Sequence, residues 1–101
     1  MGLFQKLFKG RTVPSYSQLK EEGAQIIDVR TREEFRQGHI KGSINLPLDE
    51  LNGKINQLNK EKAVITCCAS GMRSGAAKRI LKAKGFNVYN GGGWRSLNDK
   101  I

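Results

Sequence analysis

The stretch that decides the fold is Ala63-Val64-Ile65-Thr66-Cys67-Cys68-Ala69-Ser70-Gly71-Met72-Arg73-Ser74, where an apolar run leads into a turn. Its β-branched residues predict a buried strand over 63–67, and the residues from 73 to 84 predict a helix. Backbone N–H groups in the turn between them lack intrahelical partners and can converge on one point. The helix dipole favours a thiolate over a thiol there, and Arg73 adds a positive charge. We therefore predict an active site for anionic substrates, with Cys68 as its nucleophile.

Strands and helices alternate on both sides of this stretch. Further strands are predicted over 25–29, 43–46 and 86–89, and further helices over 18–22, 32–37, 47–58 and from Trp94 onward. Ser17 is the expected N-cap of the first helix, and Thr31 with Glu34 forms a capping box before the second. This alternation predicts an α/β domain with a parallel sheet covered on both faces. Ligands bind such sheets at the carboxyl ends of the strands, where the Cys68 turn is expected.

The composition describes one small domain with a basic surface. The chain has 101 residues and 18 Lys+Arg against 9 Asp+Glu, a net charge of +9 that favours anionic partners. The basic residues are spread along the chain without interleaved aromatics, so we expect no nucleic-acid partner. Two adjacent cysteines make no disulfide framework, and with one histidine they are too few for a zinc site. We expect reduced thiols and neither a metal nor a cofactor.

The amino-terminal residues form a separate short segment. Residues 1–12 are predicted to be an amphipathic arm, because Leu3, Phe4, Leu7 and Phe8 share one helical face, and residues 13–101 are predicted to be the folded domain. Packing or fraying of the arm is favoured over a weak contact of residues 3–11 with a membrane or partner. No transmembrane run and no signal-peptide core are recognised, so we expect a cytoplasmic protein.

Three stretches, in a fixed order, resemble the motifs of one known family. They are Ile27-Asp28-Val29-Arg30 followed by Glu34-Phe35 and Gly38-His39-Ile40, then Cys68 to Ser74, then Gly85-Phe86 with Gly91-Gly92-Gly93-Trp94. The first resembles the rhodanese signature, the second its active-site loop and the third its C-terminal glycine–tryptophan feature. The size and the loop look closest to single-domain, phage-shock-type thiosulfate sulfurtransferases.

The resemblance implies a fold and a reaction. The fold is a three-layer rhodanese-like α/β domain with a five-stranded parallel sheet flanked by helices on both faces. Cys68 would take a sulfur atom from thiosulfate as a persulfide and pass it to cyanide or to a thiol acceptor, either a small thiol or a thioredoxin-like protein. The implied substrate-binding groups are the amides of Ala69, Ser70, Gly71, Met72 and Arg73, together with the Arg73 side chain.

Four polar residues near these motifs are assigned supporting roles. Asp28 is expected to tie the following loop in place, and Arg30 is expected to form an ion pair with Glu34. His39 is assigned a structural hydrogen bond rather than the role of general base, because nothing in the sequence around it pairs it with Cys68.

Two positions depart from the family pattern and keep alternatives open. Ala69 stands where a basic residue is common, which favours a non-enzymatic persulfide carrier or interaction module as the alternative function. Cys67 stands where an aromatic residue is common, and either packs in the strand or resolves an oxidised Cys68. Adjacent strand residues point to opposite faces, which favours packing. Cys67 to Arg73 also has the Cys-x5-Arg spacing of tyrosine phosphatases, a minor alternative because Thr66 replaces their histidine.

Overall fold

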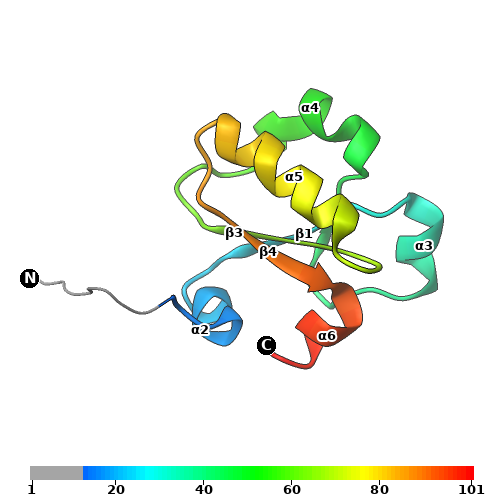
Figure 1. Cartoon of the computed structure of the whole chain (residues 1–101), viewed down its shortest axis with the longest axis horizontal. Helices are drawn as coiled ribbons and strands as arrows, with labels where there is room; N and C mark the ends of the chain where they lie inside the picture. Colours follow the sequence, from blue (N-terminus) through cyan, green and yellow to red (C-terminus); the bar gives the residue numbers. More distant parts are fainter. Residues whose placement is uncertain (1–12) are drawn as a thin grey trace, which may run out of the picture.

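Four parallel strands form a sheet between two layers of helices in a computed structural model that describes residues 13–101 (Figure 1). The strands are β1 (Gln25–Asp28), β2 (Ile44–Asn45), β3 (Val64–Cys68) and β4 (Val88–Gly93). The helices are α2 (Tyr16–Glu21), α3 (Arg32–Gln37), α4 (Leu51–Lys54), α5 (Met72–Ala83) and α6 (Trp94–Asn98), with 3-10 turns η1 (Leu48–Glu50) and η2 (Ile55–Gln57) beside α4. The predicted α/β architecture is confirmed, with four strands within residues 13–101 instead of the five that the resemblance implies.

The strand order β2-β1-β3-β4 puts the cysteine-bearing strand in the interior of the sheet. β3 pairs in parallel with β1 and with β4, so Asp28 lies opposite Cys67 and Gly93 lies opposite Cys68. The register shifts between Thr66 and Cys68 on the β4 side, the mark of a bulge at the strand's end. The carboxyl ends of β1, β3 and β4 thereby meet at one edge.

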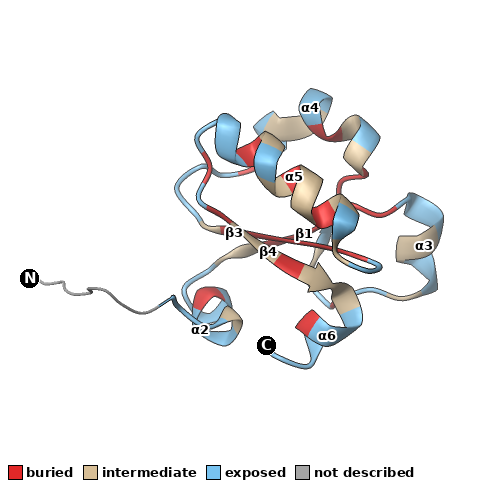
Figure 2. Cartoon of the chain, viewed as in Figure 1, coloured by how far each residue is buried: buried red, intermediate tan, exposed pale blue. Residues whose placement is uncertain are grey.

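Each face of the sheet has its own apolar core. One core, toward α4 and α5, gathers Ile27, Val64, Cys68, Ala77 and Leu81 among others, and the second, toward α2 and α6, gathers Leu19, Ile26, Ile65, Cys67 and Leu97. The buried residues of β3 run along its whole length (Figure 2). Because side chains alternate along a strand, the two adjacent cysteines belong to different cores.

The predicted N-cap is confirmed for α3 and is wrong for α2. Thr31 accepts a hydrogen bond from the Glu34 N–H at 3.2 Å, and its own N–H donates to Glu34 Oε1 at 3.1 Å, as predicted. The first helix, however, is capped by Ser15 and not by Ser17. Ser15 Oγ accepts from the Gln18 N–H at 3.1 Å, and Gln18 Oε1 accepts from the Ser15 N–H at 2.8 Å. Gln18, three residues after Ser15, completes a capping box with it, and this favours Ser15 over Ser17 as the N-cap.

The helical stretch predicted over 47–58 is confirmed, as three short consecutive helical segments. The structure divides this stretch into η1, the four-residue α4 and η2. Gly53 lies inside α4 with open space around its missing side chain, and glycine lowers helix stability in such a position.

Within residues 13–101, no helix is long and apolar enough to cross a membrane.

A close backbone contact at Gly91 gives a test of the packing. A β-carbon at Gly91 would lie 2.7 Å from Leu97 Cδ2 and 2.8 Å from the Thr66 carbonyl oxygen, so alanine does not fit without movement of α6 or β3. We predict that Gly91→Ala lowers the free energy of unfolding by about 1–3 kcal/mol. The measurement is the urea midpoint followed by circular dichroism.

The matched control is Gly53→Ala, which meets no atom within 4 Å and lies in a helix. Its free energy of unfolding should stay the same or rise by up to about 1 kcal/mol. Equal midpoints for the two variants would contradict the packing at Gly91.

Candidate active site

The Cys68 loop is a tight turn between the end of β3 and the start of α5. Gly71 has φ +107°, a left-handed conformation that favours glycine, and it stands immediately before the first residue of α5. This turn folds the chain back over the thiol. The Gly71 N–H donates to Cys68 Sγ at 3.0 Å, and the Ser74 N–H donates to it at 3.3 Å. Backbone donors therefore converge on a sulfur atom whose residue is 1% exposed.

These donors favour the thiolate form of Cys68. Burial raises the pKa of the Cys68 thiol, but hydrogen bonds from the Ser74 hydroxyl and from the N–H groups of Ser74, Gly71 and Ser70 lower it further than burial raises it. The net pKa lies below the ordinary thiol value. Since a thiolate is the reactive form of cysteine, the loop favours the reactive form of Cys68 without a histidine.

Ser74 and Asn90 extend the network behind the thiol, and the sequence did not single them out. Ser74 Oγ lies 3.5 Å from Cys68 Sγ, 2.7 Å from Asn90 Oδ1 and 3.0 Å from the Gly71 carbonyl oxygen. Its one proton can rotate, so the hydroxyl accepts from the Cys68 thiol while it donates to an oxygen, and it can donate to the thiolate instead. The Gly92 N–H donates to the same Asn90 oxygen at 2.9 Å, which fixes the orientation of the amide. The position of Ser74 in the first turn of α5 is a signal that could have identified it. Asn90 carries no comparable signal, because only the sheet brings it to Cys68.

The substrate-binding residues implied by the resemblance have different surroundings in the structure. The amides of Ser70 and Gly71 bond to Cys68, as described above. Ala69 lines the cavity beside the loop, and the Met72 side chain is 84% exposed to solvent. Arg73 points its guanidinium at a carboxylate: Nη1 lies 2.7 Å from Glu34 Oε1, and Nη2 lies 3.1 Å from Glu34 Oε2.

This bidentate pair corrects the expected Arg30–Glu34 ion pair. The Glu34 pKa is lowered to about 2, first by the hydrogen bond from Arg73 and then by the Thr31 N–H. The Arg73 pKa is raised in turn, chiefly by Glu34. The Glu34–Arg73 pair therefore joins the start of α3 to the start of α5 and holds one rim of the loop.

Arg30 instead forms a buried pair with Asp28. Arg30 Nη2 and Nε lie 2.8 and 2.9 Å from the Asp28 carboxylate oxygens, with the two side chains 5% and 0% exposed. The same Nη2 donates to the Gly38 carbonyl oxygen at 2.7 Å, and the guanidinium lies 4.8 Å from the Trp94 ring centroid. Asp28 thus fixes, through Arg30, the loop after α3 and the first residue of α6.

His39 lies on the surface with its own local partners. Its Nδ1 donates to the Phe35 carbonyl oxygen at 2.6 Å, and its ring stacks on the Phe35 ring at a centroid distance of 3.7 Å. Both contacts join the end of α3 to the segment that follows it.

Cys67 has an environment unlike that of Cys68. Burial, followed by the Asp28 carboxylate, raises the Cys67 pKa to about 12, so its thiol stays protonated at neutral pH. It packs in the core toward α2 and α6, and none of the loop amides that bond to Cys68 bonds to it. This geometry favours packing over chemistry and gives no support to a phosphatase that uses Cys67.

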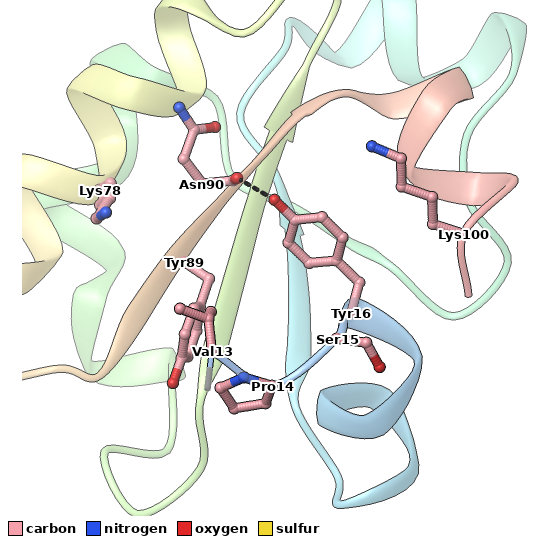
Figure 3. A pocket seen from close by; sticks show the side chains of 8 residues that line it. All are labelled: Val13, Pro14, Ser15, Tyr16, Lys78, Tyr89, Asn90 and Lys100. Atoms are coloured by element: carbon pink, nitrogen blue, oxygen red, sulfur yellow. Dashed lines mark hydrogen bonds between the residues drawn. The ribbon is translucent and has the colours of Figure 1, made fainter. Parts of the chain in front are cut away.

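Three hollows of different size lie near this region. A cavity of about 200 Å³ adjoins the loop, and its lining includes Arg30, Glu34, Gly38, Ala69, Trp94 and Arg95. A larger one of about 470 Å³ lies where α2 meets β4, with Tyr16 Oη donating to the Asn90 carbonyl oxygen at 2.8 Å (Figure 3). No residue of the Cys68 loop lines the larger hollow. A third hollow, of about 330 Å³, is lined by Arg73 together with Thr31 and Asp49. Ala69, the residue after Cys68, lines the cavity of about 200 Å³. Within residues 13–101, no group of three or more His, Cys, Asp or Glu side chains is placed to hold a metal ion.

Several known proteins are similar to this chain in sequence. The thiosulfate sulfurtransferase PspE of Escherichia coli (strain K12) is 39% identical over 74 residues, covering 70% of this chain and 71% of PspE. The uncharacterized protein YqhL of Bacillus subtilis (strain 168) is 40% identical over 80 residues, covering 77% of this chain. The putative sulfur carrier protein YrkF of the same strain is 39% identical over 66 residues, covering 65% of this chain. The chain spans 64% of YqhL and 36% of YrkF.

Solved structures and a family model agree with these relatives. Reduced CoADR-RHD from Bacillus anthracis superposes with a TM-score of 0.73 at 40% identity, covering 83% of this chain and 15% of that one. An E. coli structure described as rhodanese with anions gives a TM-score of 0.69 at 38% identity, covering 73% of this chain and 91% of that one. The model of the rhodanese-like domain matches residues 12–100. The chain therefore belongs to the rhodanese-like domain family, as its three motifs and the Cys68 loop indicate.

Proposed function

We propose that the chain is a sulfurtransferase in which Cys68 accepts a sulfur atom from an anionic donor such as thiosulfate and holds it as a persulfide. The observation that carries the proposal is the convergence of the Gly71 and Ser74 N–H groups on Cys68 Sγ at the carboxyl edge of the sheet. The lowered pKa of Cys68 supports it, because the thiolate is the attacking species. The similarity to PspE, a thiosulfate sulfurtransferase, adds support from a relative.

The proposed reaction has two steps, and the second regenerates the free Cys68 thiolate. The Cys68 thiolate attacks the outer sulfur of thiosulfate, the sulfur–sulfur bond of the donor breaks, and sulfite leaves with the electron pair. Cyanide or an acceptor thiolate then attacks the outer sulfur of the persulfide, and the Cys68 thiolate is released. The negative charge stays on sulfur throughout, so the fixed N–H donors stabilise each form as an oxyanion hole stabilises its own charge.

A sulfur carrier is the second candidate function, and the similarity to YrkF favours it. A carrier would receive sulfur from a partner protein and would turn over free thiosulfate slowly. Ala69 agrees with this alternative, because the first residue after Cys68 brings no charge to the cavity. Steady-state turnover with thiosulfate and a small acceptor separates the two functions: rapid turnover supports the enzyme, and loading only by a partner desulfurase supports the carrier.

The first prediction concerns which cysteine carries the sulfur. We expect thiosulfate to add one sulfur atom to Cys68 and Cys68→Ser to abolish both this mass gain and thiocyanate formation. Cys67→Ala should keep both, because its thiol is protonated and faces the other core. Mass spectrometry of the intact protein with non-reducing peptide mapping makes the measurement. Sulfur found on Cys67 in the native protein would refute the assignment.

The second prediction concerns the pH dependence of the thiol. Because the Cys68 pKa is lowered, its reaction with iodoacetamide should stay fast at pH values where an ordinary thiol is already protonated. Ser74→Ala removes a hydrogen bond to sulfur, so the midpoint of the rate–pH curve should move to higher pH. Ser70→Ala is the control, since Ser70 contributes its N–H and keeps it. A midpoint that Ser74→Ala leaves in place would show that the hydroxyl does not stabilise the thiolate.

A further inference from the structure

Arg95 on α6 is carried to the Cys68 loop by the pairing of β3 with β4. Gly93 lies opposite Cys68 in the sheet, and a β-carbon on Gly93 would lie 2.9 Å from the Ala69 carbonyl oxygen. α6 begins at the next residue, so its first turn is fixed against the loop. Arg95, in this turn, lines the same 200 Å³ cavity as Ala69.

The other two arginines at this edge of the sheet already have carboxylate partners. Arg73 forms its bidentate pair with Glu34, and Arg30 forms its buried pair with Asp28. Glu34 also lines the cavity, but its carboxylate is bound by Arg73, so it is not an unpaired negative charge facing a ligand. The net charge that these four residues bring to the cavity is close to zero.

Arg95 differs from both arginines in its partners. Among the contacts within residues 13–101, its guanidinium makes no ion pair and no hydrogen bond to another residue. It lies 4.9 Å from the centroid of the Trp94 ring, a stacking contact that leaves the N–H groups at its edge available. Trp94 is itself held in place, since the Arg30 guanidinium also lies over it and Gly38 lies under its edge. The indole therefore gives Arg95 a fixed support beside the cavity.

We propose that Arg95 is the anion-binding side chain of the cavity and receives the oxygen atoms of the sulfur donor while the donor's outer sulfur faces Cys68. The proposal rests on the proposed function and specifies its substrate class as small oxyanions with a terminal reactive sulfur. The planar guanidinium suits such a group, because it bonds to two oxygen atoms at once. Ala69 adds no charge at this position, so Arg95 supplies the positive charge that the donor requires.

The test compares two alkylating reagents that differ in charge. Iodoacetate is an anion and iodoacetamide is neutral, and both transfer a similar small group to a thiolate. In Cys67→Ala protein Cys68 is the only thiol, so the ratio of the two alkylation rates reports anion attraction at Cys68 alone. This ratio does not require any sulfur transfer. It therefore remains informative even if Cys68 forms no persulfide, which would instead refute the proposed function.

We expect Arg95→Gln to lower the iodoacetate-to-iodoacetamide ratio about tenfold and Arg95→Lys to retain most of it. Arg79→Gln is the matched control, because Arg79 is an exposed arginine on α5 that does not line the cavity, and its ratio should equal that of the parent. Added salt should lower the parent ratio more than the Arg95→Gln ratio. With thiosulfate, Arg95→Gln should raise KM about tenfold with little change in kcat.

Three results would overturn the proposal. One is an unchanged ratio in Arg95→Gln. Another is an equal loss of rate with both reagents, which would show that Arg95 only supports Trp94 and the loop. A loss of the same size in Arg79→Gln would also overturn it, because the effect would then belong to the overall positive charge.

Discussion

The buried pair of Asp28 and Arg30 is the interaction on which the surroundings of the loop depend. Asp28 is the last residue of β1, which pairs with β3. Arg30 is bound to the Asp28 carboxylate, donates a hydrogen bond to the Gly38 carbonyl oxygen, and packs over the ring of Trp94. One guanidinium thus positions the end of β1, the loop after α3 and, far away in the sequence, the first residue of α6. Removing one member of such a pair costs about 3–5 kcal/mol, because the remaining charge is left buried. The pair is therefore a structural requirement of the cavity even though neither side chain donates a hydrogen bond to Cys68 Sγ.

The alternation of side chains along β3 places the adjacent residues Cys67 and Cys68 on opposite faces of the sheet. Cys67 faces the core toward α2 and α6 and is kept protonated by burial and by Asp28. Cys68 faces the other side, where the turn at Gly71 brings N–H groups to its sulfur. A single peptide bond separates a thiol whose pKa is raised to about 12 from one whose pKa is lowered. The sequence already favoured packing for Cys67, and the structure supplies the physical reason.

β1, β3 and the loop could be predicted because their signals are local. β-branched runs, the Thr31–Glu34 capping box and the Cys68 turn are each contained in a few consecutive residues. The last strand was predicted over 86–89, but β4 runs Val88–Gly93 and includes three glycines, which local propensity disfavours in a strand. The partner of Glu34 could not be predicted, because Arg30 and Arg73 are both near in space and only the tertiary structure decides between them. Asn90 and Arg95 were missed for the same reason: β4 brings them to the loop, and no local pattern records that pairing. The N-cap of α2 was placed at Ser17 instead of Ser15, because two nearby serines compete for that position and the reciprocal bond with Gln18 decides between them. The amphipathic arm lies outside the described residues.

The depth of Cys68 has a consequence for the sizes of the two reactants in the proposed cycle. Its residue is only 1% exposed, so a donor must present a narrow, protruding atom to reach the sulfur. Once that atom is transferred, the reactive end of the side chain lies one sulfur–sulfur bond, about 2 Å, further from the backbone. The second reactant then meets its target nearer to the cavity mouth and needs less reach than the first. In the proposed cycle, a site of this shape favours a small sulfur donor in the first step and accommodates a bulkier acceptor thiol in the second.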